Sequence, residues 1–278
     1  MGLRIRTNIP SLAVQKNLRE STEAVEKEFS KLSSGKRLTK AADDAAGMAI
    51  ANRLQAHVKG LQQARRNAND GISLVQTAEG AVGEVSNIII RLRELSVQAA
   101  SDTVGMKERD LLNQEYQSLI TEIDRIAEAT TFNGAKLLNG ENEMGRIDIH
   151  VGADAGEEHK ITFDSEEANI KTEAIGIEGL NVLEKESAIE SFTTLDDALD
   201  NVVKVRAKLG AMQARLTSTS GQLEIQAMNE ESARSVIEDT DIADSTAKLT
   251  GNQIIKNAGM ATLVQANSIS AGAIRLIG

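Results

Sequence analysis

Residues 54–96 read LQAHVKGLQQARRNANDGISLVQTAEGAVGEVSNIIIRLRELS, and this stretch decides the fold. Apolar or small residues recur in it mainly at intervals of three and four, which places them on one stripe of an α-helix. The stripe consists of Leu54, Val58, Leu61, Ala68, Ile72, Val75, Ala78, Val82, Val85, Ile89, Leu92 and Ser96. No proline interrupts it. The spacing therefore predicts one helix over residues 45–100, roughly 80 Å long at about 1.5 Å per residue.

Three other segments repeat this spacing. They predict a helix over residues 11–33, a shorter antiparallel helix after the break at residues 101–105, and a long helix that includes residues 195–223. Their stripes are Leu18, Thr22, Val25, Phe29 and Leu32; Leu112, Tyr116, Leu119, Ile123 and Ile126; and Leu195, Leu199, Val202, Val205, Leu209, Met212, Leu216, Thr219 and Leu223. The helix of residues 45–100 and the last two segments can close around each other as a bundle.

Between the helical segments the period changes from helical to two. Ile147, Ile149 and Val151 alternate with polar residues, and Ile161 and Phe163 do the same after a glycine-containing turn. This pattern is typical of a β-hairpin. The predicted fold class is therefore mainly α, a long antiparallel helical bundle and coiled coil with a small β-hairpin region.

The last 40 residues form a helix with a different pattern. Their apolar residues are interleaved with Ala, Gly and Ser and spread around the helix instead of forming one stripe. A helix that is apolar on several faces must be buried on several faces. Within one subunit only the helix of residues 11–33 is available to cover it. We therefore expect the uncovered surface to bind other copies of the chain.

Composition excludes several classes of function. The formal charge of −10 lacks the basic surface that nucleic acids require, and the absence of cysteine excludes disulfides, thiol catalysis and thiolate zinc sites. No apolar run resembles a cleavable signal peptide, and none approaches the roughly 18 residues that cross a membrane. We therefore expect no membrane span, and export, if it occurs, by a dedicated apparatus.

No residues form a convincing catalytic, metal or cofactor site. Asp43 and Asp44 are better explained as acids at a helix N-terminus than as paired acid–base catalysts. The acids Asp239, Asp241 and Asp244 lack the glycine and final glutamate of a calcium loop. The three histidines are His57, His150 and His159, and His-Glu-x-x-His does not occur. We expect a non-enzymatic protein without metal or cofactor, and keep an enzyme on a helical scaffold as the rival class.

Several motifs carry a family resemblance. At the amino-terminal end they are LSSGKRL at residues 32–38, DDAAGMAIANR at 43–53, RNANDGIS at 66–73, RELSVQA at 93–99, EIDRI at 122–126 and TFNG at 131–134. At the carboxyl-terminal end they are IEDTDIA at 237–243 and LVQAN at 263–267. In this order, over residues 1–140 and 195–278, the chain resembles a bacterial flagellin. It resembles a short form that lacks large central outer domains.

The resemblance implies a division of the chain into shells of a filament. Residues 1–42 and 239–278 would form the two halves of an inner coiled-coil domain. Residues 43–180, including the hairpin, and residues 195–238 would form the surrounding helical bundle. A short linker at residues 181–194 would stand in place of the outer domains.

The resemblance also implies the function and the partners. The subunit would be exported, polymerise through its terminal helices and form the extracellular flagellar filament used for swimming. Implied partners are further copies of the chain, an export chaperone, the type III export apparatus, the filament cap and hook-associated proteins. The alternative within the family is a flagellin-like protein of the hook–filament junction.

Two sets of residues follow as candidate binding sites. For self-assembly the candidates are Leu18, Val25, Phe29, Leu32, Ile254, Ile255, Leu263, Val264, Ile269 and Leu276. By the resemblance, Arg91, Leu95 and Glu115 match positions through which flagellins engage the innate receptor Toll-like receptor 5 in a host. The simpler reading is also open, in which Arg91 and Glu115 are solvated or subunit-contact charges and Leu95 is a packing residue.

Overall fold

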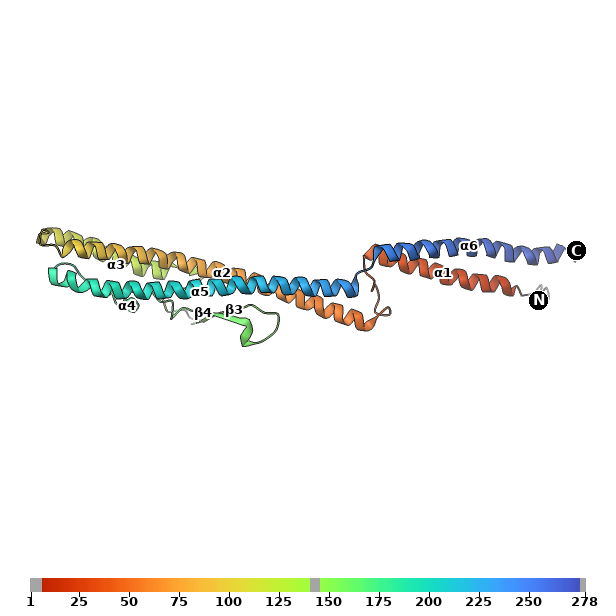
Figure 1. Ribbon diagram of the computed structural model, residues 1–278, viewed down its shortest axis with the longest axis horizontal. Coiled ribbons are helices and arrows are strands. Elements are labelled where there is room, and N and C mark those ends of the chain that lie inside the picture. Colours follow the sequence, from red (N-terminus) through yellow and green to blue (C-terminus); the bar gives the residue numbers. More distant parts are fainter. Residues whose placement is uncertain (1–6, 141–145, 276–278) are drawn as a thin grey trace. The chain divides into compact units, whose positions relative to one another are not determined.

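The computed structural model describes the backbone of residues 7–140 and 146–275, and the side chains within these ranges up to residue 268. The helices are α1 (Ile9–Ser34), α2 (Ala45–Ala99), α3 (Met106–Ala129), α4 (Thr172–Ile175), α5 (Lys185–Glu238) and α6 (Ile242–Arg275). The strands are β1 (Thr131–Phe132), β2 (Ala135–Lys136), β3 (Arg146–His150) and β4 (Lys160–Asp164), with a 3₁₀ turn at Glu157–His159. The mainly α prediction is confirmed (Figure 1).

The chain divides into two compact units. One consists of residues up to 56 together with those from 229 onward, and the other of residues 57–228. These boundaries differ from the expected ones at 42/43 and 238/239. The reason is local packing: Leu38 contacts the first turn of α2 near Gly47, and Arg37 is hydrogen-bonded to the last turn of α5 at Glu238.

The core of the 57–228 unit is the predicted aliphatic stripe of α2, packed against α3 and α5 (Figure 1). Its fully buried members on α2 include Val75, Val82, Val85, Ile89 and Leu92, and α3 and α5 contribute Tyr116, Ile123, Leu195, Val202, Leu209 and Leu216. The sequence therefore predicted the buried face of the bundle. The expected linker at residues 181–194 is wrong, because α5 is helical from Lys185 and buries Ala188 and Ser191.

A cluster of hydroxyl groups lies inside this aliphatic core. Ser191 of α5 donates a hydrogen bond to Oγ of Ser96 on α2 at 2.9 Å, and Ser96 donates to the carbonyl of Leu92 at 2.9 Å. The hydroxyl of Tyr116 on α3 is buried near these serines but forms no hydrogen bond within the described part of the chain. Burial raises the pKa of Tyr116, and the two serine hydroxyls oppose that shift. The bond between Ser191 and Ser96 therefore favours a single register between α2 and α5.

The predicted β-hairpin is present as β3 and β4, paired antiparallel with Ile149 opposite Ile161. It packs on α2 at glycines. A Cβ at Gly71 would lie 2.7 Å from Cδ1 of Ile149, and one at Gly60 would lie 3.1 Å from Cβ of Ala153. Between these two glycines, Asn67 donates a hydrogen bond to the carbonyl of His150 at 2.9 Å. The two glycines therefore let the hairpin approach the helix closely, at a cost in helix propensity.

A second, shorter hairpin was not predicted. Strands β1 and β2 are joined by Asn133 and Gly134, which have φ angles of +50° and +82°. Two consecutive residues with positive φ are typical of a type I′ turn, for which Asn-Gly is the favoured sequence. The signal was present in the motif at residues 131–134, but strands of two residues are too short to show a period of two.

Candidate functional site

Helices α1 and α6 lie side by side and antiparallel (Figure 1). The residues that face the partner helix recur at alternating intervals of three and four on both helices. On α1 they are Ser11, Val14, Leu18, Ser21, Val25, Glu28 and Leu32, and on α6 they are Ser245, Leu249, Asn252, Lys256, Gly259, Leu263 and Ala266; all are buried or half-buried. We call these two rows the terminal seam. On α1 its most buried members are polar.

Hydrogen bonds connect the two helices along the terminal seam. Asn8 Nδ2 donates to the carbonyl of Ala266 at 3.0 Å, and Ser11 Oγ donates to Oδ1 of Asn267 at 2.9 Å. Further along, Ser21 Oγ donates to the carbonyl of Asn252 at 3.3 Å. These bonds run from side chains to the opposite helix, so they define which residues of α1 and α6 meet.

The terminal seam differs from the predicted stripe at two positions. Leu18, Val25 and Leu32 lie in the seam as expected, but Ser21 and Glu28 take the places assigned to Thr22 and Phe29. Glu28 is buried, with one carboxylate oxygen 2.7 Å from Lys31 Nζ and the other without a hydrogen bond. Phe29 is 64% exposed. At both positions the prediction chose the more apolar of two neighbouring residues, Thr22 and Phe29. In the structure α6 covers the preceding residue instead, Ser21 and Glu28.

The large apolar side chains that the pair leaves exposed form what we call the outer apolar surface. It consists of Ile9, Leu12 and Phe29 on α1, and Ile242, Ile254, Ile255, Met260 and Val264 on α6, each between 45% and 71% exposed. Covering these side chains with another molecule would remove apolar surface from water, which is favourable, so they are candidates for contacts with a partner. Of the remaining self-assembly candidates, Leu263 is half-buried in the terminal seam, the side chain of Ile269 is outside the described set, and Leu276 lies outside the described residues.

The chain crosses between helices twice beside this pair, at residues 35–44 and 239–241. The first crossing is hydrogen-bonded to the second: Arg37 N donates to the carbonyl of Glu238 at 2.7 Å, and Thr240 N donates to the carbonyl of Gly35 at 3.0 Å. The Arg37 guanidinium also donates to the carbonyl of Ile237 at 2.8 Å. A cation is favourable at the carboxyl end of a helix, where backbone carbonyls lack partners. This contact therefore stabilises the end of α5.

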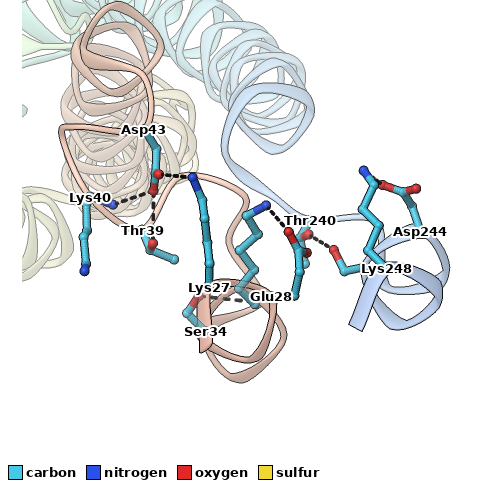
Figure 2. Close-up of polar contacts among 11 residues, drawn as sticks. Lys27, Glu28, Ser34, Thr39, Lys40, Asp43, Thr240, Asp244 and Lys248 are labelled. Atoms are coloured by element: carbon cyan, nitrogen blue, oxygen red, sulfur yellow. Dashed lines mark hydrogen bonds and ion pairs between the residues drawn. The ribbon is translucent and has the colours of Figure 1, made fainter. Parts of the chain in front are cut away.

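Asp43 connects the first crossing to α1. Figure 2 shows its carboxylate facing Lys27, Thr39 and the backbone of Lys40. The Lys27 Nζ lies 2.7 Å from Oδ1, and Thr39 Oγ1 and Lys40 N each donate to Oδ2 at 3.2 Å. The hydrogen bond from Lys27 lowers the pKa of Asp43 to about 2, and the bonds from Lys40 and Thr39 act in the same direction. The carboxylate is thus held ionised.

The contacts of Asp43 should make this unit sensitive to acid. A carboxyl whose pKa is lowered on folding contributes stability above its unfolded pKa, and loses that contribution as the pH falls through the folded value. We therefore expect Asp43→Asn to lower the thermal midpoint of the full chain at pH 5, and the difference from wild type to vanish towards pH 2. Thermal melts followed by circular dichroism measure the two midpoints. For Lys27→Met the difference in midpoint from wild type should also shrink as the pH falls. A difference that stayed constant with pH would show that the Asp43 carboxylate does not stabilise the fold.

The candidate receptor residues lie on the other unit. Arg91 is exposed and lies 2.8 Å from Glu115 on α3 and 2.9 Å from Glu94 one turn along α2. These two carboxylates raise the pKa of Arg91, and the hydrogen bond with Glu94 is the largest single cause. Leu95 is fully buried in the core. Of the three candidates, Arg91 and Glu115 have exposed side chains, whereas Leu95 is a packing residue of the core.

The acids and histidines have local structural partners. Asp44 accepts a hydrogen bond from Gly47 N at 2.9 Å at the start of α2, and Asp241 accepts one from Ala243 N at 2.8 Å at the start of α6. The rings of His150 and His159 are 6.5 Å apart, edge to face. Within residues 7–140 and 146–275, no three His, Asp or Glu side chains are arranged to hold a metal ion. No helix there is both long and apolar enough to cross a bilayer.

Comparisons with known proteins agree over nearly the whole chain. The bacterial flagellin N-terminal helical region matches residues 5–143, and the bacterial flagellin C-terminal helical region matches residues 192–277. A flagellin of Halalkalibacterium halodurans is 36% identical over 98% of this chain and 99% of its own. The flagellar filament 30.7 kDa core protein of Treponema maltophilum is 34% identical over 98% and 99%.

A solved structure agrees as well. The crystal structure of Bacillus cereus flagellin, 31% identical, aligns with 61% of this chain and 94% of its own, with a TM-score of 0.51. These matches favour a filament subunit over a hook–filament junction protein. The chain therefore belongs to the bacterial flagellin family and is a structural subunit of the flagellar filament, not an enzyme.

Proposed function

We propose that the chain polymerises through the outer apolar surface of α1 and α6. The observation that carries this proposal is the division of labour on these helices: polar and small residues occupy much of the terminal seam, while Phe29, Ile254, Ile255 and Val264 point away from it. These four side chains are 59–71% exposed, so covering one of them completely gains most but not all of the roughly 1.5–3 kcal/mol that full burial contributes. Several of them covered by neighbouring subunits supply a large part of the assembly free energy.

The separation of the terminal seam from the outer apolar surface also supports an arrangement of the chain in an inner and a surrounding domain. Residues 1–42 and 239–278 form the inner coiled-coil domain of each subunit, where contacts between copies are densest. Residues 43–180, with the hairpin, and α5 from Lys185 to Glu238 form the surrounding bundle. The self-assembly residues then act in two ways: Leu18, Val25, Leu32 and Leu263 hold α1 to α6, and the outer apolar surface, with Ile269 and Leu276, meets other subunits.

Export precedes assembly in this proposal. The partners are a flagellar export chaperone, the type III export apparatus, the filament cap and hook-associated proteins. A terminal seam with polar residues at its centre gains little from burial within one subunit, so its ordering entropy is repaid mainly on assembly. Terminal segments that order late suit a chain that is exported unfolded.

The experiment is deletion of the gene, followed by electron microscopy of the cells. Cells without the gene should lack filaments, and re-expression of the wild-type chain should restore them. Normal filaments after deletion, in a strain that makes no other flagellin, would refute the proposal.

Recognition by Toll-like receptor 5 in a host is a second proposed activity, supported by the exposed Arg91–Glu115 pair. Replacing Arg91 or Glu115 with alanine should weaken receptor signalling in reporter cells at least about tenfold, the effect of losing a charged contact at a protein interface. The melting curve should change little, because surface ion pairs contribute little to stability. Unchanged signalling by both variants would leave these residues with a purely structural role.

A further inference from the structure

We propose that Asn133 is a site of spontaneous deamidation, a covalent modification that the fold directs to one of the chain's two Asn-Gly dipeptides. The dipeptides are Asn133-Gly134 and Asn139-Gly140, six residues apart. They share the same local sequence chemistry, but the structure places them in opposite environments. This inference is independent of the proposed assembly mechanism.

The first dipeptide is open to reaction. Asn133 and Gly134 are both exposed at the turn between β1 and β2, and within the described residues Asn133 is the one non-glycine residue with a positive φ. No atom lies within 4 Å of the place where a Cβ on Gly134 would be. Both residues of this dipeptide therefore lie at the surface, in contact with solvent.

The second dipeptide is enclosed. Asn139 is 1% exposed and follows Leu137 and Leu138, which are fully buried. Its neighbour Gly140 has a φ of +70°, and a Cβ there would lie 2.6 Å from Nδ2 of Asn169. Gly140 itself is half-buried, so the enclosure rests on Asn139, whose side-chain amide is out of reach of water until the segment around it opens locally.

The reaction needs only water and base. The deprotonated peptide nitrogen of Gly134 attacks Cγ of Asn133, a C–N bond forms, and the side-chain amide leaves as ammonia, which gives a cyclic succinimide. Water then breaks one of the two C–N bonds of the ring. Opening at Cγ yields aspartate, and opening at the former backbone carbonyl yields isoaspartate. No atom is oxidised or reduced, and either product carries one carboxylate where the chain had a neutral amide.

Isoaspartate should loosen the short hairpin. It inserts a methylene into the main chain of a two-residue turn, whose conformation sets the pairing of Phe132 with Ala135. Phe132 is half-buried and packs against the core of the bundle. The product therefore affects a segment next to the core, although the reaction begins at the surface.

The test is incubation of the full folded chain in mildly alkaline buffer, with peptide mass spectrometry to follow replacement of the amide by a carboxyl at each dipeptide. We expect Asn133 to react at least about tenfold faster than Asn139, because Asn139 must wait for local opening. In the urea-denatured chain the two rates should converge. An Asn133→Ser variant should lose the fast reaction and keep the slow one.

Two outcomes would overturn the proposal. Equal rates in the folded chain would show that burial does not select between the dipeptides. A folded chain that reacts at neither position, while the denatured chain reacts at both, would show that the type I′ turn protects Asn133.

Discussion

A chain that lacks residues 240–278 should keep a folded 57–228 unit and form no filaments. The deletion removes α6, and with it most of the outer apolar surface and every contact that α1 makes across the terminal seam. The buried core of the 57–228 unit contains no residue from the deleted segment. Circular dichroism should therefore still show a cooperative helical melt. Electron microscopy and sedimentation measure the loss of fibres, which should be complete.

Single substitutions on α6 separate the outer apolar surface from the mere presence of the helix. Ile254→Asp places a carboxylate on that surface. Gln253→Asp introduces the same carboxylate at an exposed polar neighbour that is not part of the surface. The first variant should raise the concentration needed for assembly at least about tenfold, since burying an unpaired carboxylate costs several kcal/mol. The second should assemble nearly as wild type.

Normal fibres from the chain that lacks residues 240–278 would contradict the proposed function outright.

The second large effect is expected in the bundle, at two adjacent isoleucines. Ile89 is 1% exposed and lies in the core, whereas Ile90, the next residue of α2, is turned about 100° around the helix and is 45% exposed. Ile89→Ala should lower the free energy of unfolding by about 2–5 kcal/mol, because it removes buried methyl groups and leaves a cavity. Urea denaturation of the full chain, followed by circular dichroism, gives this value.

Ile90→Ala is the matched control, since it makes the same chemical change one residue away. It should cost less than about 1 kcal/mol in the free chain, because the side chain already contacts solvent. The comparison of the two variants tests which side of the helix in residues 54–96 faces the core, and not only whether the helix contains apolar residues. Similar losses for the two variants would mean that α2 faces the core differently.

The aliphatic bundle was predictable because its pattern is long and redundant. Many positions from Leu54 to Ser96 share one stripe, so a few ambiguous residues do not move its phase. The hairpin of β3 and β4 was also predictable, since Ile147, Ile149 and Val151 alternate with polar residues. The shells, the export route and the receptor residues came instead from resemblance to flagellins, not from residue periodicity.

The local sequence signal was weaker in the terminal helix α1. Phe29 and Glu28 are neighbours, and hydrophobicity favours Phe29 for the interior, yet the structure buries Glu28. The choice depends on which side of α1 the helix α6 covers. That is set by contacts between residues 200 or more positions apart, such as those of Ser21 with Asn252 and of Arg37 with Ile237.

The sequence by itself therefore determined the mainly α class, the buried stripe of the bundle, the main hairpin and the apolar surplus of the carboxyl-terminal helix. These depend on periodicity, which is local. Only the tertiary structure decided that the most buried residues of α1 in the terminal seam are polar, that Leu95 is buried while Arg91 and Glu115 are exposed, and that Asn133 is exposed while Asn139 is enclosed. Each of these depends on which distant segment covers a given face, and residue spacing along one helix carries no information about its partner.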